Sequence, residues 1–142
     1  MNLPAKTEYA CLAVLELAAW YGSDEPVRIR SIADRQGIPS PFLVQILLQL
    51  KGAGLVESTR GAAGGYRLVR DPANLSLGEV VTIIEGASGD LQSNAMRTTA
   101  ATRVLLDVWT ETDAARREAL AGISFADLLE RVRGRAESMY YI

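Results

Sequence analysis

Residues 28–69 read RIRSIADRQGIPSPFLVQILLQLKGAGLVESTRGAAGGYRLV, and this stretch decides the fold. Its first part predicts a short helix that ends at Gly37, because glycine is favoured just past a helix end. Ser40 followed by Pro41 predicts the start of a second helix, with Ser40 as the N-cap and proline in the first turn. Two short helices joined by about three residues indicate a helix-turn-helix over about residues 28–52.

The remainder of the stretch predicts a β-hairpin, or wing, over about residues 55–69. Its two ends are typical of strands, and the segment RGAAGG between them carries three glycines and one arginine. We expect the glycines to make a flexible tip. A helix-turn-helix followed at once by a basic, glycine-rich hairpin indicates a winged helix.

Helices are predicted on both sides of this module. Residues 6–21 form a helix that is apolar on nearly all sides, so we expect it to be buried on more than one face. Ser76 and Glu79 form a capping box at the start of another helix, which Gly86 ends. The predicted fold class is mainly α with a small β-hairpin wing, and its first domain, the winged helix-turn-helix, spans residues 1–86.

Residues 87–142 are predicted to hold a loop, a long dimerisation helix and a C-terminal helix capped by Ser124 and Asp127. The long helix, from about Ala95 to Ala121, carries small and aliphatic residues at alternating spacings of four and three, which is a heptad pattern. We expect this pattern to pair with a second copy of the chain. The expected interface residues are Ala101, Leu105, Val108, Trp109, Thr112 and Ala115.

The charge is distributed unevenly along the chain. Residues 26–70 hold seven basic and two acidic side chains, a net charge of +5, although the whole chain carries −2. A basic segment inside an acidic chain is typical of a DNA-binding module, and an ordinary solvated surface is the alternative.

The residue inventory argues against an enzyme. With one cysteine, Cys11, and no histidine, the chain cannot form an internal disulfide or a histidine-dependent catalytic group, and it offers no usual zinc site. Cys11 is either a redox switch or an inert buried thiol. The chain start lacks the features of a secretory signal, and the longest apolar stretch is too short to span a bilayer. We therefore expect a cytoplasmic protein that has no membrane partner.

Several motifs occur in one order along the chain. They are DRQGI at 34–38, FLxQ at 42–45, AGLV at 53–56, RGxxGGYRL at 60–68, LGEV at 77–80 and ISFADL at 123–128. With these residues the chain resembles the Rrf2 family of winged-helix regulators, which includes IscR, NsrR and CymR, over roughly residues 3–130. The resemblance implies a dimer crossed by long C-terminal helices, with each recognition helix in a major groove and each wing in a minor groove.

The chain departs from the family's pattern both at the cluster ligands and at positions that read DNA. The cluster-binding members carry three cysteines near the start of the long helix, whereas residues 86–106 here hold neither cysteine nor histidine. We therefore expect no iron–sulfur cluster, no metal and no other cofactor. Many members carry glutamate directly before the glutamine of the recognition helix, and Val44 takes that place here.

Candidate DNA contacts come from both parts of the winged helix. Gln45 can pair with adenine in the major groove, Ser40 suits a phosphate, and Arg60 with its glycines suits a narrow minor groove. Val44 and Leu48, one turn apart on the outward side of the helix, could meet thymine methyl groups, or they could mark a surface for a protein partner. The candidate residues are Arg28, Arg30, Ser40, Pro41, Val44, Gln45, Gln49, Arg60, Gly61, Gly64 and Gly65.

Two functions remain open at this point. The first is a homodimeric, sequence-specific repressor that binds a palindromic operator in double-stranded DNA and responds to a small-molecule or protein effector. The second is a protein-interaction module that kept the winged helix but binds an enzyme or a regulator. The apolar recognition helix motivates the second, and the basic segment with its intact wing favours the first.

Overall fold

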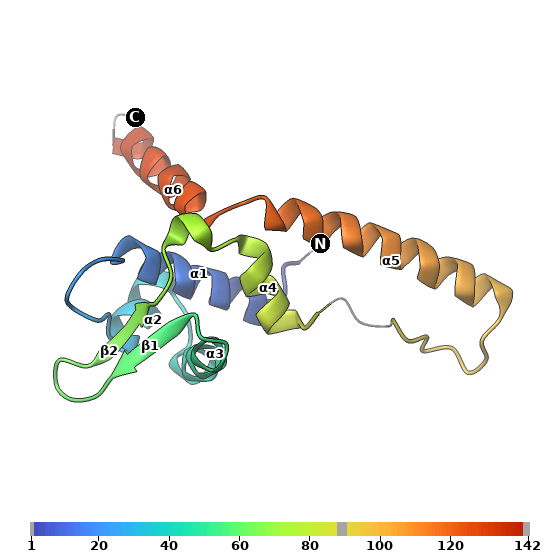
Figure 1. Cartoon of the computed structure of the whole chain (residues 1–142), viewed down its shortest axis with the longest axis horizontal. Helices are drawn as coiled ribbons and strands as arrows, with labels where there is room; N and C mark the ends of the chain where they lie inside the picture. The colour runs from blue at the N-terminus through green and yellow to red at the C-terminus, as the bar shows by residue number, and fades with distance from the viewer. Residues whose placement is uncertain (1, 88–90, 141–142) are drawn as a thin grey trace.

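The computed structural model describes residues 2–87 and 91–140 and confirms a mainly helical chain with a β-hairpin. Its elements, in chain order, are α1 (Ala5–Ala19), α2 (Ile29–Gln36), α3 (Ser40–Gly52), β1 (Val56–Thr59), β2 (Gly65–Leu68), the 3-10 turn η1 (Pro72–Asn74), α4 (Leu77–Glu85), α5 (Ala100–Ala121) and α6 (Phe125–Tyr140). Figure 1 shows α1 to α4 and the hairpin gathered into one body, from which α5 projects. None of the described helices is both long enough and apolar enough to cross a bilayer.

The predicted helix-turn-helix is formed by α2 and α3. Gly37 ends α2 with a φ of 67°, in the left-handed region that glycine adopts without strain. The expectation that Ser40 is an N-cap was wrong, because Ser40 is already the first helical residue and Pro39 occupies the cap position. The Pro39 carbonyl accepts hydrogen bonds from the backbone amides of Phe42 and Leu43, both at 3.1 Å. The helix α3 therefore begins one residue earlier than predicted.

The wing is an antiparallel hairpin in which Val56 pairs with Leu68. Val27 adds a short bridge to its outer side, exchanging two backbone hydrogen bonds of 2.8 Å with Tyr66. The glycines serve close packing: a Cβ on Gly65 would lie 2.4 Å from the Val27 carbonyl oxygen, and one on Gly64 only 2.3 Å from that of Thr59. These two glycines are therefore required because other backbone atoms pack closely against them, whereas the sequence suggested that they make the tip flexible.

The core lies between α1 and the helices around it. As expected, α1 is buried on more than one face. The capping box of Ser76 and Glu79 is confirmed, with both reciprocal hydrogen bonds present at the start of α4. The fully buried large side chains are Val14, Leu17, Ile32, Leu43, Ile46, Leu47, Leu50, Leu75, Val80 and Phe125.

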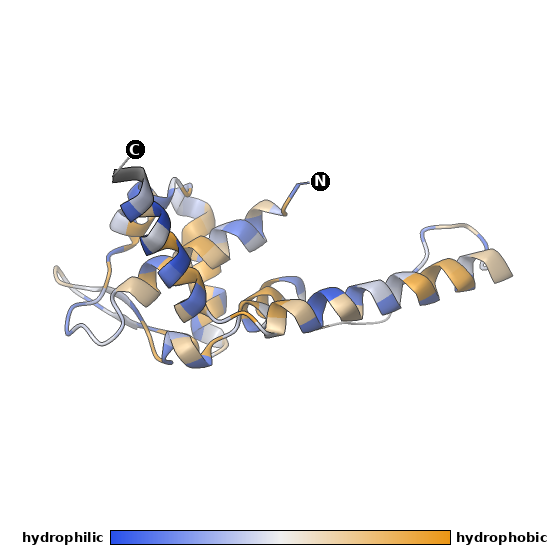
Figure 2. Ribbon diagram, turned by 90° about the horizontal axis from the view of Figure 1, so that it is seen from above, coloured by the Kyte–Doolittle hydropathy of each residue, from blue (hydrophilic) through white to orange (hydrophobic). Residues whose placement is uncertain are grey.

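Helix α5 starts at Ala100, five residues later than expected. The side-chain hydroxyls of Thr99 and Thr102 each accept a hydrogen bond from the other residue's backbone amide. This reciprocal cap fixes the start of the helix. At its other end α5 meets α4 closely, since a Cβ on Gly78 would lie 2.9 Å from the backbone nitrogen of Ala121. None of the 22 residues of α5 is buried, and Figure 2 shows that its outer half is hydrophobic.

Helix α6 returns to the body and packs against α1. Its first residue, Phe125, is fully buried in the core, and the Phe125 amide donates to the Leu75 carbonyl at 2.9 Å. The expected Ser124 cap is present, with the Asp127 amide donating to the Ser124 hydroxyl at 3.1 Å. A residue of the predicted C-terminal part thus completes the core of the N-terminal part.

Candidate nucleic-acid interface

The outward side of α3 carries most of the candidate contacts from the recognition helix. Ser40, Pro41, Val44 and Gln45 are all exposed there, whereas the opposite side of the helix is buried. Gln49 does not share this arrangement, because its side-chain amide donates to the Ile83 carbonyl at 2.8 Å and it is half-buried against α4. We therefore leave Gln49 out of the proposed contacts.

The basic segment is partly neutralised within the fold. Three of its arginines form ion pairs with glutamates: Arg35 with Glu16 at 2.9 Å, Arg70 with Glu79 at 2.5 Å and Arg67 with Glu57 at 3.8 Å. The other four cations have no ion-pair partner among the described carboxylates, and all four are exposed. They are Arg28, Arg30, Lys51 and Arg60.

These four cations come from the start of α2, the last turn of α3 and the wing tip. Lys51 lies in the last turn of α3, where its ammonium group donates to the Ser58 hydroxyl of β1 at 2.7 Å. The sequence analysis missed Lys51, although a lysine in the last turn of a recognition helix was a usable signal. Arg28 and Arg30 lie at the start of α2, and Arg60 lies at the wing tip.

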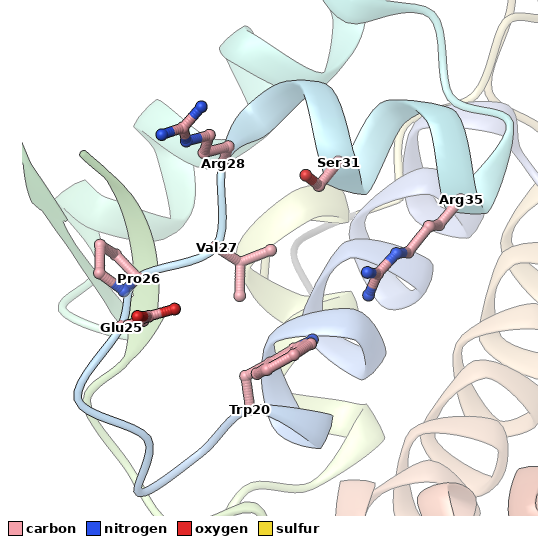
Figure 3. Close-up of a pocket in the computed structure, with 7 residues that line it drawn as sticks. All are labelled: Trp20, Glu25, Pro26, Val27, Arg28, Ser31 and Arg35. Atoms are coloured by element: carbon pink, nitrogen blue, oxygen red, sulfur yellow. The ribbon is translucent and has the colours of Figure 1, made fainter. Parts of the chain in front are cut away.

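Arg28 links α2 to the wing. One of its guanidinium nitrogens donates to the Ala62 carbonyl at 2.5 Å, and in Figure 3 its side chain points away from Trp20. Gly61, which precedes Ala62, has a φ of 106°, a conformation that is strained for any residue with a side chain. The wing tip is thus held against the start of the helix-turn-helix, and Arg28 keeps further N–H groups for another acceptor.

A buried carboxylate that the sequence analysis did not use fixes the position of α2. Glu16 of α1 accepts hydrogen bonds from Arg35 and Gln36, both at 2.9 Å. Figure 3 shows Arg35 turned toward Trp20, with the guanidinium 5.7 Å from the ring centroid, across a cleft of about 200 Å³. A single acid inside the apolar stretch of α1 was the sequence signal for this contact.

The expected dimer residues lie on α5 and all are exposed in the single chain. Leu105 is 60% exposed and Trp109 is 62% exposed, values that are unusual for side chains of this size. The described part of the chain therefore does not cover this surface. The residues in question are Ala101, Leu105, Val108, Trp109, Thr112 and Ala115.

A polar network holds the inner end of α5 against the body. Glu85 of α4 accepts a hydrogen bond from the buried Thr7 hydroxyl at 2.9 Å and pairs with Arg116 at 3.1 Å. Arg117 and Arg116 both donate to Asp113 at about 3.0 Å, and these bonds lower the pKa of the Asp113 carboxyl. The network therefore joins α1, α4 and α5.

The side chains do not fit an iron or iron–sulfur site. The single thiol, Cys11, is half-buried on α1, and burial followed by the negative charge of Glu85 raises its pKa to about 11. A thiol of that pKa stays protonated at neutral pH, whereas metal binding needs the thiolate. The described residues also contain no group of three or more histidine, cysteine, aspartate or glutamate side chains placed to hold a metal.

The chain is similar to known transcription regulators over most of its length. A family model described as "Rrf2: Iron-dependent Transcriptional regulator" matches residues 3–131. The HTH-type transcriptional regulator slr0846 of Synechocystis is 37% identical over 136 residues, covering 90% of this chain and 87% of that protein.

Two solved structures have the same fold. The structure of T. potens IscR matches with a TM-score of 0.73 and 32% identity, over 93% of this chain and 88% of that one. CymR, the global cysteine regulator of B. subtilis, matches with a TM-score of 0.73 and 28% identity, over 92% of this chain and 98% of that one. These similarities identify a regulator and not an enzyme, and the chain belongs to the Rrf2 family of winged-helix transcriptional regulators.

Proposed function

We propose that this chain is a homodimeric, cytoplasmic repressor that binds a palindromic DNA operator through α3 and its wing. The observation that carries the proposal is the exposed outward side of α3, in a winged helix whose α2, α3 and wing carry four exposed cations without described carboxylate partners. Phosphates on both sides of a groove are the natural partners of such cations, and the helix between them reaches the base edges. A dimer bound across two half-sites excludes other proteins from that DNA, which is sufficient for repression.

The exposed residues of α5 support the homodimer. A helix of 22 residues without a buried side chain gains stability by packing its apolar face on a second helix. A two-fold dimer also presents two recognition helices to one side of DNA, about one helical turn or a multiple of it apart.

The effector is proposed to act near the segment 87–103, where cluster-binding relatives place their ligands. Residues 88–90 of this segment lie outside the described residues. Its described remainder contains the exposed side chains of Leu91 and Met96. An apolar small molecule or a protein partner is the proposed signal, and either would act on the outer end of α5.

Selection from a random pool of double-stranded DNA tests the proposal. The purified full-length protein should enrich a palindromic sequence, and its affinity should fall steeply as the salt concentration rises. The absence of any salt-dependent binding would favour the alternative, a protein-interaction module. The exposed Phe42 and Leu48 on α3 are the observation behind that alternative.

Replacing Arg60 by alanine should weaken DNA binding while leaving the fold intact. Arg60 is exposed at the wing tip, so its loss removes one cationic contact with DNA without disturbing the core. The slope of log affinity against log salt concentration should decrease by about 1. Fluorescence anisotropy with labelled operator measures both values. Arg133→Ala, on the exposed surface of α6, is the matched control, and equal behaviour of the two variants would contradict a role for the wing.

The protein should purify colourless and bind its operator without iron. The chain supplies one cysteine and no histidine, so a dimer offers two thiols, which is too few for a cluster held by thiolates. Anaerobic treatment with iron and sulfide, followed by visible absorption and iron analysis, checks this. A stoichiometric cluster that depends on Cys11 and changes DNA affinity would overturn the expectation.

A further inference from the structure

The middle of the outward side of α3 is almost entirely apolar. Pro41, Val44, Gln45 and Leu48 follow one another at helical spacing, opposite the buried leucines of the same helix. Val44 is 39% exposed and Leu48 is 53% exposed. Gln45 is thus the one side chain of these four that can form hydrogen bonds with a base.

The polar side chains beside this line are already engaged. The Gln49 amide donates to the Ile83 carbonyl at 2.8 Å, and the Lys51 ammonium donates to Ser58 at 2.7 Å. Gln49 is thereby held toward α4, whereas the Lys51 ammonium, at the end of the helix, keeps two further N–H groups for a phosphate. A partner that binds the centre of α3 therefore contacts two aliphatic side chains, Val44 and Leu48, and the amide of Gln45.

The edges of base pairs in the major groove offer one apolar group, the C5-methyl group of thymine. An aliphatic side chain placed over any other base edge leaves hydrogen-bonding groups of that base without water and without a partner. Resting on the proposed DNA-binding function, we infer that Val44 and Leu48 are specificity-determining residues that select thymines through their methyl groups. Gln45, between them, pairs with an adjacent adenine.

The spacing of the two residues sets the spacing of the bases. Residues four apart in a helix are separated by about 6 Å along its axis. Neighbouring base pairs are about 3.4 Å apart along the duplex axis and farther apart along the groove, so the two thymines lie one or two steps apart in a half-site rich in A·T pairs.

The charges around α3 favour DNA over a protein as the occupant of this surface. Arg28 and Arg30 at the start of α2, Lys51 in α3 and Arg60 at the wing tip are exposed and have no described carboxylate within ion-pairing distance. Such cations complement two rows of phosphates. An apolar surface meant for a protein partner does not need them.

Deoxyuridine in place of thymine gives a sharp test, because it removes the methyl group and keeps every hydrogen-bonding group. Synthetic duplexes of the selected operator carry one such replacement at a time, and full-length protein is titrated against each. At two positions of each half-site the affinity should fall about fourfold, as expected for one buried methyl group. The remaining positions should show little change.

Two variants assign these effects to the residues. In Val44→Ala and Leu48→Ala, deoxyuridine at the matching position should cost nothing further, because the partner of the methyl group is already missing. Val132→Ala, which changes a valine on α6 that is as exposed as Leu48, is the control that should keep the full fourfold effect. Both Val44 and Leu48 are exposed, so circular dichroism should show unchanged folding.

The outcomes separate this inference from the proposed function. If the affinity for the operator does not change with any deoxyuridine replacement, methyl recognition is overturned and DNA binding stands. The same holds if deoxyuridine still lowers the affinity of both Val44→Ala and Leu48→Ala. A lack of binding to any DNA overturns both.

Discussion

Replacing Phe125 by alanine should lower the free energy of unfolding by about 3–5 kcal/mol, as for other fully buried aromatic residues. Phe125 has no exposed surface, and it fills the core at the point where α6 meets the body. Alanine would leave a cavity there and weaken the attachment of α6 to α1. Chemical denaturation followed by circular dichroism measures the change, at equal protein concentrations because a dimer unfolds in a concentration-dependent way.

Phe42→Ala is the matched control for this experiment. The Phe42 side chain is 58% exposed, and its described aromatic contact is a tilted pair with Tyr9 whose ring centroids are 6.2 Å apart. Its loss should cost about 1 kcal/mol or less. A similar cost for both variants would show that α6 does not depend on Phe125 for its attachment.

Replacing Leu105 by aspartate should convert the dimer into a monomer at micromolar concentration. Leu105 lies on the hydrophobic outer half of α5 and is 60% exposed in the single chain, so it is available to a second copy. An unpaired carboxylate buried in that interface costs several kcal/mol, and a two-fold dimer contains the substitution twice. Since about 1.4 kcal/mol corresponds to a factor of ten, the dissociation constant should rise at least a hundredfold.

Sedimentation velocity checks the dimer prediction directly, and operator titration should show a parallel loss of affinity. Ala114→Asp places the same charge on α5 but more than a third of a turn away from the Leu105 side, so it should remain dimeric. A monomer for the unmodified protein at micromolar concentration, or a dimer for Leu105→Asp, would contradict the proposed interface.

The local signals of the sequence were sufficient to predict the winged helix. Gly37 and the capping box of Ser76 act within one or two turns of their own helices, and the structure confirms both. The start of α5 was misplaced because Ala95, Met96 and Arg97 favour a helix by composition, whereas in the described structure residues 95–99 are all exposed and are not helical. The reciprocal cap of Thr99 and Thr102 then decides where the helix begins.

The proposed site was harder to predict because several side chains depend on distant parts of the chain. Glu16 neutralises Arg35 although the two are 19 positions apart, and the Ile83 carbonyl holds the Gln49 amide across 34 positions. Gly65 is required by the backbone of Val27, a residue on the far side of the helix-turn-helix in sequence. Sequence patterns report which residues share a helix face, but they do not report contacts of this range.

The attachment of α5 at one end makes the helix a lever. Its ion pair and hydrogen bonds to α4 come from Arg116 and Arg117 near its inner end, and its 22 residues extend about 33 Å from end to end. From that pivot to the far end the helix is about 24 Å long, so a tilt of about 10° moves the far end by roughly 4 Å, slightly more than one base-pair step of about 3.4 Å. In a dimer joined through the N-terminal ends of α5, the angle between α5 and α4 at the Glu85–Arg116 ion pair thus determines the distance between the two copies of α3. In the proposed dimer, operator spacing would then depend on residues of α4 and α5, which are outside the proposed DNA contacts.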